Sequence, residues 1–146
     1  MFFGESEYKI DEKGRVPIPP KFRRELGKEG VVLTPGVEKC INAYPLSAWK
    51  KLATTLTAGP VPPNKLRRLN RAIFATAFSP GIDGQGRIAL PIQLRQYAEI
   101  VSEVVIAGAN NYFELWNKVL WEEEKAVSQE QAWQNIESLE RRNESK

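Results

Sequence analysis

The chain repeats itself at an offset of 72 positions, and this repeat constrains the fold more than any other feature. Constant spacing over some forty residues, without any insertion, indicates a duplicated unit. Residues that recur unchanged include Ile10 and Ile82, Asp11 and Asp83, Gly14 and Gly86, Arg15 and Arg87, Pro19 and Pro91, Arg23 and Arg95, and Trp49 and Trp121.

Each copy carries the same local signals in the same order. Alternating apolar residues predict strands, and a glycine that favours positive φ predicts the turn between the first two. A proline that cannot donate to a sheet ladder ends the second strand and opens a short helix. The predicted elements are strands at 8–10 and 74–78, turns at 11–14 and 83–86, strands at 15–18 and 87–90, helices from Pro19 and from Pro91, and hairpins over 31–44 and 104–116.

Helical segments follow each copy. The sequence predicts helices over 46–56 and 65–75, joined by a stiff proline-rich linker, and a C-terminal helix over 118–142. We therefore expect three parts: a first repeat with its helix (1–58), a linker and helix (59–76), and a second repeat with the C-terminal helix (77–146). The tryptophans are expected in the core or at subunit contacts rather than on a nucleic acid: Trp49, Trp116, Trp121 and Trp133.

Composition argues against an enzyme. The chain has no histidine and a single cysteine, Cys40, so the commonest general base and Cys/His zinc sites are excluded. We expect no metal, no cofactor, no small-molecule substrate and no catalytic activity. No segment approaches the ~18 apolar residues of a membrane span, and the first residues lack a signal-peptide pattern. A lone cysteine fits a reduced compartment, so the expected location is the cytoplasm.

Charge is distributed unevenly along the chain. Residues 1–100 carry sixteen Lys and Arg against nine Asp and Glu, whereas residues 101–146 carry five against nine. No acidic residue occurs between Glu38 and Asp83. This asymmetry favours a polyanionic partner for the first two thirds of the chain, although a solvated basic face gives the same pattern.

The doubled motif resembles a known class of DNA-binding unit. Residues 10–19, which read Ile-Asp-Glu-Lys-Gly-Arg-Val-Pro-Ile-Pro, and residues 22–27, which read Phe-Arg-Arg-Glu-Leu-Gly, are similar to the motif of AbrB-type (SpoVT/AbrB) regulators. Two such motifs in a chain of this length resemble the MraZ family, as do the opening residues 2–4 and the late Phe113-Glu114-Leu115-Trp116.

This resemblance implies an α+β fold: a swapped-hairpin β-barrel formed by the two internal repeats around a pseudo-two-fold, with peripheral helices that include a C-terminal amphipathic helix. It also implies a sequence-specific, nucleoid-associated transcriptional regulator that binds double-stranded DNA. The target would be direct repeats upstream of the division and cell-wall gene cluster, including the protein's own gene. The protein would act as a ring-like homo-oligomer.

Candidate DNA-binding residues come from both copies of the motif. Arg15 and Arg87 are candidates for reading guanine edges, the alternative being an ion pair with the aspartate four residues earlier. The remaining candidates contact phosphate or line an exposed helix face: Arg23, Arg24, Arg95, Lys13 and Lys21. Asp11, Gly14, Asp83 and Gly86 are expected to build the turns. Where the first copy has Lys13, Lys21 and Arg24, the second has glutamine, so the first arm is more basic.

Three further arginines and two other functions remain open. Arg67, Arg68 and Arg71 either touch DNA or pair with the acidic C-terminal helix of a neighbouring subunit, for which Glu122, Glu123 and Glu124 are the obvious counterparts. An antitoxin-like barrel that neutralises a protein partner is one alternative function, and a non-catalytic assembly scaffold is another. The tryptophan-bearing C-terminal helix disfavours the antitoxin, which would be expected to end in a disordered, partner-wrapping tail.

Overall fold

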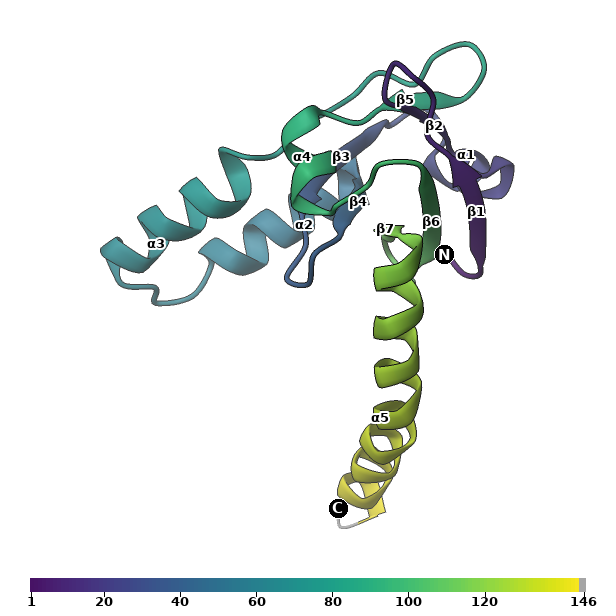
Figure 1. Ribbon diagram of the computed structural model, residues 1–146. Helices are drawn as coiled ribbons and strands as arrows, with labels where there is room; N and C mark the ends of the chain where they lie inside the picture. Colours follow the sequence, from purple (N-terminus) through teal and green to yellow (C-terminus); the bar gives the residue numbers. More distant parts are fainter. Residues whose placement is uncertain (145–146) are drawn as a thin grey trace.

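The structure is a computed structural model that describes residues 1–144. Its fold is mixed α+β, as expected. Residues 145 and 146, the end of the predicted 77–146 unit, lie outside the described residues. The elements are β1 (Glu5–Lys9), β2 (Arg15–Pro17), α1 (Pro20–Leu26), β3 (Val31–Pro35), β4 (Ile41–Pro45), α2 (Leu46–Thr57), α3 (Pro63–Leu69), the π-helical turn η1 (Asn70–Phe74), β5 (Arg87–Ala89), α4 (Ile92–Tyr97), β6 (Glu103–Gly108), β7 (Phe113–Asn117) and α5 (Lys118–Glu144) (Figure 1).

Strands of the two repeats pair with each other rather than only within their own copy. The five-stranded antiparallel sheet has the order β1-β6-β7-β4-β3, so β1 of the first repeat pairs with β6 of the second, and β4 pairs with β7. A separate two-stranded ribbon joins β2 to β5. The repeats therefore complete each other's sheets.

The register of these pairings shows that the two repeats are related by a pseudo-two-fold axis. Val16 pairs with Ile88, its own equivalent 72 positions later, and both are almost fully buried. Asn42 likewise pairs with its equivalent Glu114 in the β4–β7 ladder. The axis passes through both pairs, which places the two copies of the Asp-x-x-Gly-Arg turn on opposite sides of one ribbon.

Both repeats contribute to a single hydrophobic core. Phe2 and Phe22 of the first repeat surround Phe113 of the second, with ring centroids 5.2–5.3 Å apart. The same cluster takes in buried residues of α1, α4 and every strand from β2 to β7. Cys40 is fully buried beside Val105 and Trp116 in a smaller cluster. Burial raises the pKa of its thiol.

Two helical arms project from this body in different directions (Figure 1). The first arm comprises α2, α3 and η1, residues 46–74, and the second is α5. Each is anchored at its root by an equivalent aromatic pair, Tyr44 with Trp49 and Trp116 with Trp121, both with centroids 5.8 Å apart. No helix among residues 1–144 is both long enough and apolar enough to cross a membrane.

The prediction of a strand over 74–78 was wrong. The helical arm instead continues through η1 to Phe74, whose ring packs on Trp49 at 5.3 Å. Phe78 forms only an isolated bridge with Leu33 of β3. Packing of Phe74 against α2 outweighs the alternating pattern that suggested a strand, and so the second repeat lacks a full counterpart of β1.

Candidate nucleic-acid interface

Each Asp-x-x-Gly-Arg turn is organised by its aspartate. Asp11 Oδ1 accepts hydrogen bonds from the backbone N–H groups of Lys13 at 2.9 Å and Arg15 at 2.8 Å. Asp83 makes the same two bonds in the second repeat, both at 2.9 Å. The backbone N–H of the motif arginine is the main reason that the pKa of each carboxyl lies below its usual value. Both turns are therefore built on ionised aspartates near neutral pH.

The motif arginines are braced by the same aspartates. The Nε of Arg15 donates to Asp11 Oδ2 at 2.7 Å, and the Nε of Arg87 donates to Asp83 Oδ2 at 2.9 Å. Arg87 Nη1 also lies 3.9 Å from Asp11 Oδ2, which links the two repeats across the axis. A guanidinium has five donors, so an Nε bond to aspartate holds its plane while leaving other N–H groups for a ligand. The ion-pair and DNA-contact interpretations are thus geometrically compatible.

Each motif glycine lies in close contact with an arginine side chain of the opposite repeat. Gly86 has φ +76°, and a Cβ at this position would overlap the guanidinium of Arg23, whose Cζ would lie 2.6 Å from it. Gly14 has φ +75° and faces Arg95 in the same way, with Cζ 3.0 Å from the point that a Cβ would occupy. Arg95 Nε also donates to the carbonyl of Leu90 at 3.0 Å. Each site therefore needs glycine for two reasons, its φ and the close approach of the crossing arginine.

Replacing Gly86 by alanine is expected to destabilise the protein. A non-glycine residue at this φ costs about 1–3 kcal/mol, and the added methyl group must also displace Arg23. Gly84 in the same turn is the matched control, because its φ is not positive and no described residue comes within 4 Å of the point where its Cβ would lie. Urea denaturation of both variants measures the difference. Equal loss of stability, or none, in the two variants would contradict the crossed packing.

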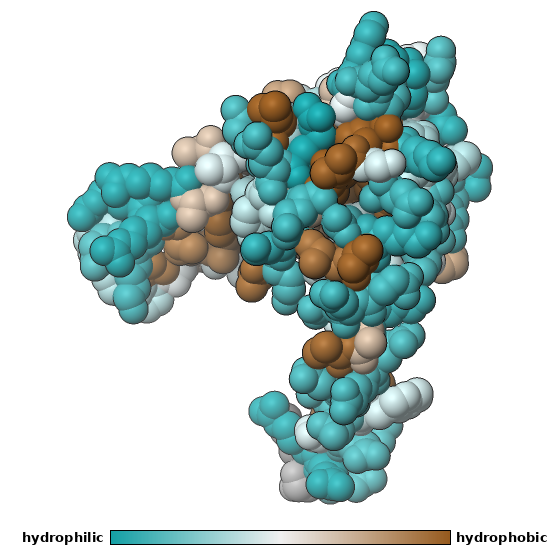
Figure 2. All heavy atoms as spheres, in the orientation of Figure 1, coloured by the Kyte–Doolittle hydropathy of each residue, from teal (hydrophilic) through white to brown (hydrophobic). Residues whose placement is uncertain are grey.

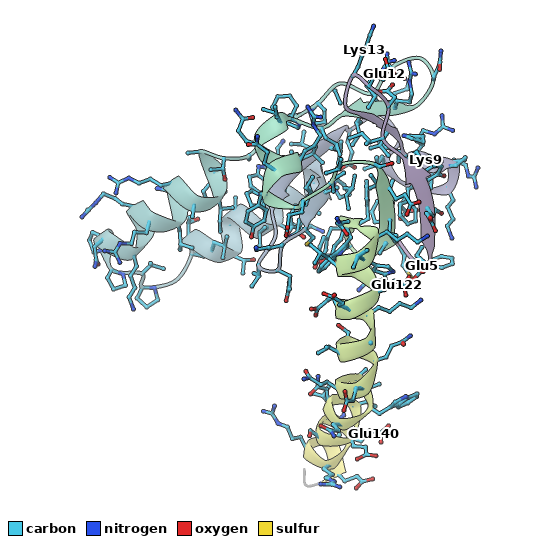
Figure 3. All side chains as sticks on the ribbon, in the orientation of Figure 1. Glu5, Lys9, Glu12, Lys13, Glu122 and Glu140 are labelled. Carbon is cyan, nitrogen blue, oxygen red and sulfur yellow. The ribbon has the colours of Figure 1, made fainter. Side chains whose placement is uncertain are left out.

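The other candidate residues surround this centre unevenly. Lys13 and Glu12 lie at the tip of the first turn and point away from the body (Figure 3). Arg24 is exposed in the last turn of α1. Lys21 instead lies over the ring of Phe3, 4.4 Å from its centroid, and is thereby held beside the N-terminal segment. The structure thus brings Arg15, Arg87, Arg23 and Arg95 together around the ribbon, with Lys13 beside them at the turn tip.

Sequence reasoning did not find the contact between each arginine and the opposite glycine. Arg23 and Gly86 are 63 positions apart, and only the pairing of β2 with β5 brings them together. The sequence signal for this contact was the identical spacing from Gly14 to Arg23 and from Gly86 to Arg95. It indicates equivalent roles, but not that the contact crosses between copies.

Comparison with known proteins agrees with the doubled architecture. The family model described as "MraZ protein, putative antitoxin-like" matches the chain twice, at residues 1–71 and 73–144. A Dehalococcoides mccartyi (strain BAV1) protein is 60% identical over 141 residues, 96% of this chain and 99% of that protein. A Herpetosiphon aurantiacus protein is 44% identical over 122 residues, covering 84% and 85%. Both carry the name "Transcriptional regulator MraZ". With two matches that span nearly all of its length, the chain belongs to the MraZ family.

Proposed function

We propose that this protein is a sequence-specific DNA-binding transcriptional regulator without enzymatic activity. The observation that carries the proposal is the convergence of both motif turns and four arginines on one ribbon, β2–β5. The names of the relatives and the family support the same function. The ribbon and the five-stranded sheet share one core, and backbone bonds from Ile18 to Gly86 and from Leu90 to Gly14 cross the axis. These links favour the expected swapped-hairpin barrel.

Different residues would serve different parts of recognition. Arg15 and Arg87 keep N–H groups free beyond their aspartate bonds, so they are the proposed readers of guanine edges. Arg23 and Arg95 support the turns from the opposite repeat and would contact phosphate with Arg24 and Lys13. Lys21 would reach phosphate only by leaving the Phe3 ring. The first turn and helix carry more cations, so that half of the face would bind more strongly.

A single face of this size is expected to bind weakly at physiological salt, because few phosphates are neutralised. We propose that several copies assemble, so that each meets one of several direct repeats and effective concentration multiplies the weak contacts. The proposed targets lie upstream of the division and cell-wall gene cluster, including the protein's own gene. We propose that the protein acts in the cytoplasm, associated with the nucleoid.

Footprinting of the purified protein on genomic fragments tests the proposal. We expect protection of regularly spaced short repeats, at low salt and less completely as salt rises. A parallel titration of a fragment with one repeat should show much weaker binding than the full array. Failure to protect any sequence over a non-specific background would contradict the proposed function and favour a protein-binding role.

A further inference from the structure

The two motif turns differ in how many arginines each aspartate contacts. Asp11 Oδ2 accepts a hydrogen bond from the Nε of Arg15 at 2.7 Å and also lies 3.9 Å from Nη1 of Arg87 in the opposite repeat. Asp83 Oδ2 pairs with Arg87 at 2.9 Å, but among residues 1–144 it forms no ion pair with Arg15. The pseudo-two-fold axis therefore relates the two turns but not these contacts.

The residues across the ribbon break the symmetry at the same place. In the β2–β5 register Arg87 stands opposite Pro17, whereas Arg15 stands opposite Ala89. Directly opposed residues of an antiparallel pair lie on one face, with Cβ atoms about 4.5–5.5 Å apart. Arg87 thus has the bulkier neighbour, and its side chain is 26% exposed against 32% for Arg15. The unequal contacts accompany a difference in sequence between the repeats.

The unequal contacts leave the two arginines with different freedom. Among residues 1–144, Arg15 is bonded through Nε, so both of its Nη groups remain for the bidentate contact by which arginine reads guanine. Arg87 has its Nε on Asp83 and its Nη1 turned toward Asp11, so its orientation depends on both turns. The end of the molecule that carries β2 and β5 is covered mainly by hydrophilic groups (Figure 2), as a face for a charged ligand requires.

The two oxygens of the Asp11 carboxylate have different partners. Oδ1 accepts the backbone N–H groups of Lys13 and Arg15, which builds the turn. Oδ2 faces the two guanidinium groups. An asparagine keeps the first function, because its side-chain oxygen forms the same kind of turn. Its NH₂ group has no acceptor for a guanidinium, so Asp11→Asn separates turn building from the contacts with arginine.

We infer that Asp11 is a positioning residue for both motif arginines: it holds Arg15 within its own turn and Arg87 across the axis. The inference rests on the DNA-binding function proposed above and deepens it, because it names the group that fixes the two base-reading side chains relative to each other. Asp83 positions Arg87 alone. The first repeat therefore orients both arginines, and the two halves of the face are not equivalent.

Side-chain NMR of the free protein tests this link without DNA. Asp11→Asn should change the guanidinium N–H signals of both Arg15 and Arg87. Asp83→Asn, the matched control with the same change in charge, should change those of Arg87 alone. Circular dichroism checks that both variants are folded. Unchanged Arg87 signals in Asp11→Asn, or an equal change at Arg15 in Asp83→Asn, would overturn the positioning role.

Arginine-to-lysine variants test the same link from its other end and do not depend on the folding of Asp11→Asn. Arg87→Lys should shift the carboxyl carbon signal of Asp11, because the contact across the axis is altered. Arg15→Lys should leave the carboxyl signal of Asp83 as it is in the parent. Shifts of the same size at both aspartates, or none at Asp11, would contradict the one-sided contact.

Affinity for the footprinted repeats relative to unrelated DNA shows whether the positioning serves recognition. Asp11→Asn and Asp83→Asn each add one positive charge, so the electrostatic gain on any DNA is the same for both. We expect Asp11→Asn to lose most of the preference for the repeats and Asp83→Asn to lose a smaller part, since Asp11 still contacts Arg87 in the second variant. Equal losses, or no loss in Asp11→Asn, would overturn the role of Asp11. A parent protein without any preference would overturn the proposed function itself, and the recognition role of Asp11 with it.

Discussion

Replacing Arg15 by alanine is expected to abolish specific DNA binding while the protein stays folded and assembled. Loss of one base contact costs about 1–3 kcal/mol, and the loss recurs in every copy bound to an array. The ion pair with Asp11 is partly exposed, so its removal should change stability little. Fluorescence anisotropy on a fragment that carries the natural repeats measures the effect.

Two further variants distinguish base recognition by the Arg15 guanidinium from the effect of its positive charge. Arg15→Lys keeps the cation but loses the planar fork, so it should also lose specificity while retaining non-specific binding. Arg141→Ala removes an arginine at the far end of α5 and should bind like the parent. If Arg15→Ala binds like the parent, the motif arginine serves only to brace its turn. If it unfolds the protein, Arg15→Lys still answers the question.

A chain that ends at Ala58 is expected to be unfolded or aggregated. Such a chain loses the partners of β1, β2 and β4, because these strands pair with β6, β5 and β7 of the second repeat. Only the β3–β4 hairpin keeps its ladder, and an isolated hairpin is marginal in water. Thermal melting followed by circular dichroism, together with light scattering, tests this expectation.

Complementation provides the control for that truncation. The exposed segment around Gly59–Pro63 lies between the helices of the first arm and outside the core, so a chain cut there should still assemble from its two pieces. Mixed fragments 1–60 and 61–146 should therefore regain a cooperative transition. A stable, monomeric and cooperatively melting 1–58 fragment would contradict the shared core of the two repeats.

The repeat made much of the local structure predictable. Turn residues such as Asp11 and Gly14 recur with their spacing, and local hydrogen bonds to the aspartate are enough to define the turn. Helices predicted over 46–56 and 118–142 occur at 46–57 and 118–144. The apolar residues of α2 gather on one face, as the pattern predicts, whereas those of α5 do not, so the expectation of an amphipathic C-terminal helix was wrong. In contrast, the segment 74–78 is short, and its conformation depends on contacts with other parts of the chain, the packing of Phe74 on Trp49 and the bridge of Phe78 with Leu33.

The arrangement of the candidate site depends on contacts that no local pattern encodes. The crossing of Arg23 over Gly86 and the pairing of Val16 with its own equivalent both follow from how the repeats are joined. Duplication implies that the copies are alike, but it is equally consistent with two separate units side by side. The swapped pairing was expected only from the family resemblance.

Hydrogen–deuterium exchange with and without DNA tests the central claim, that both repeats form one DNA-binding face. The protein is compared free and bound to a fragment that carries its footprinted repeats, at a salt concentration where binding is complete. We predict slower amide exchange in both turns together, 11–15 and 83–87, and in the adjoining α1 and α4, with no added protection from DNA along α5. Protection confined to one turn, or found only on the helical arms, would contradict a shared face built around the β2–β5 ribbon.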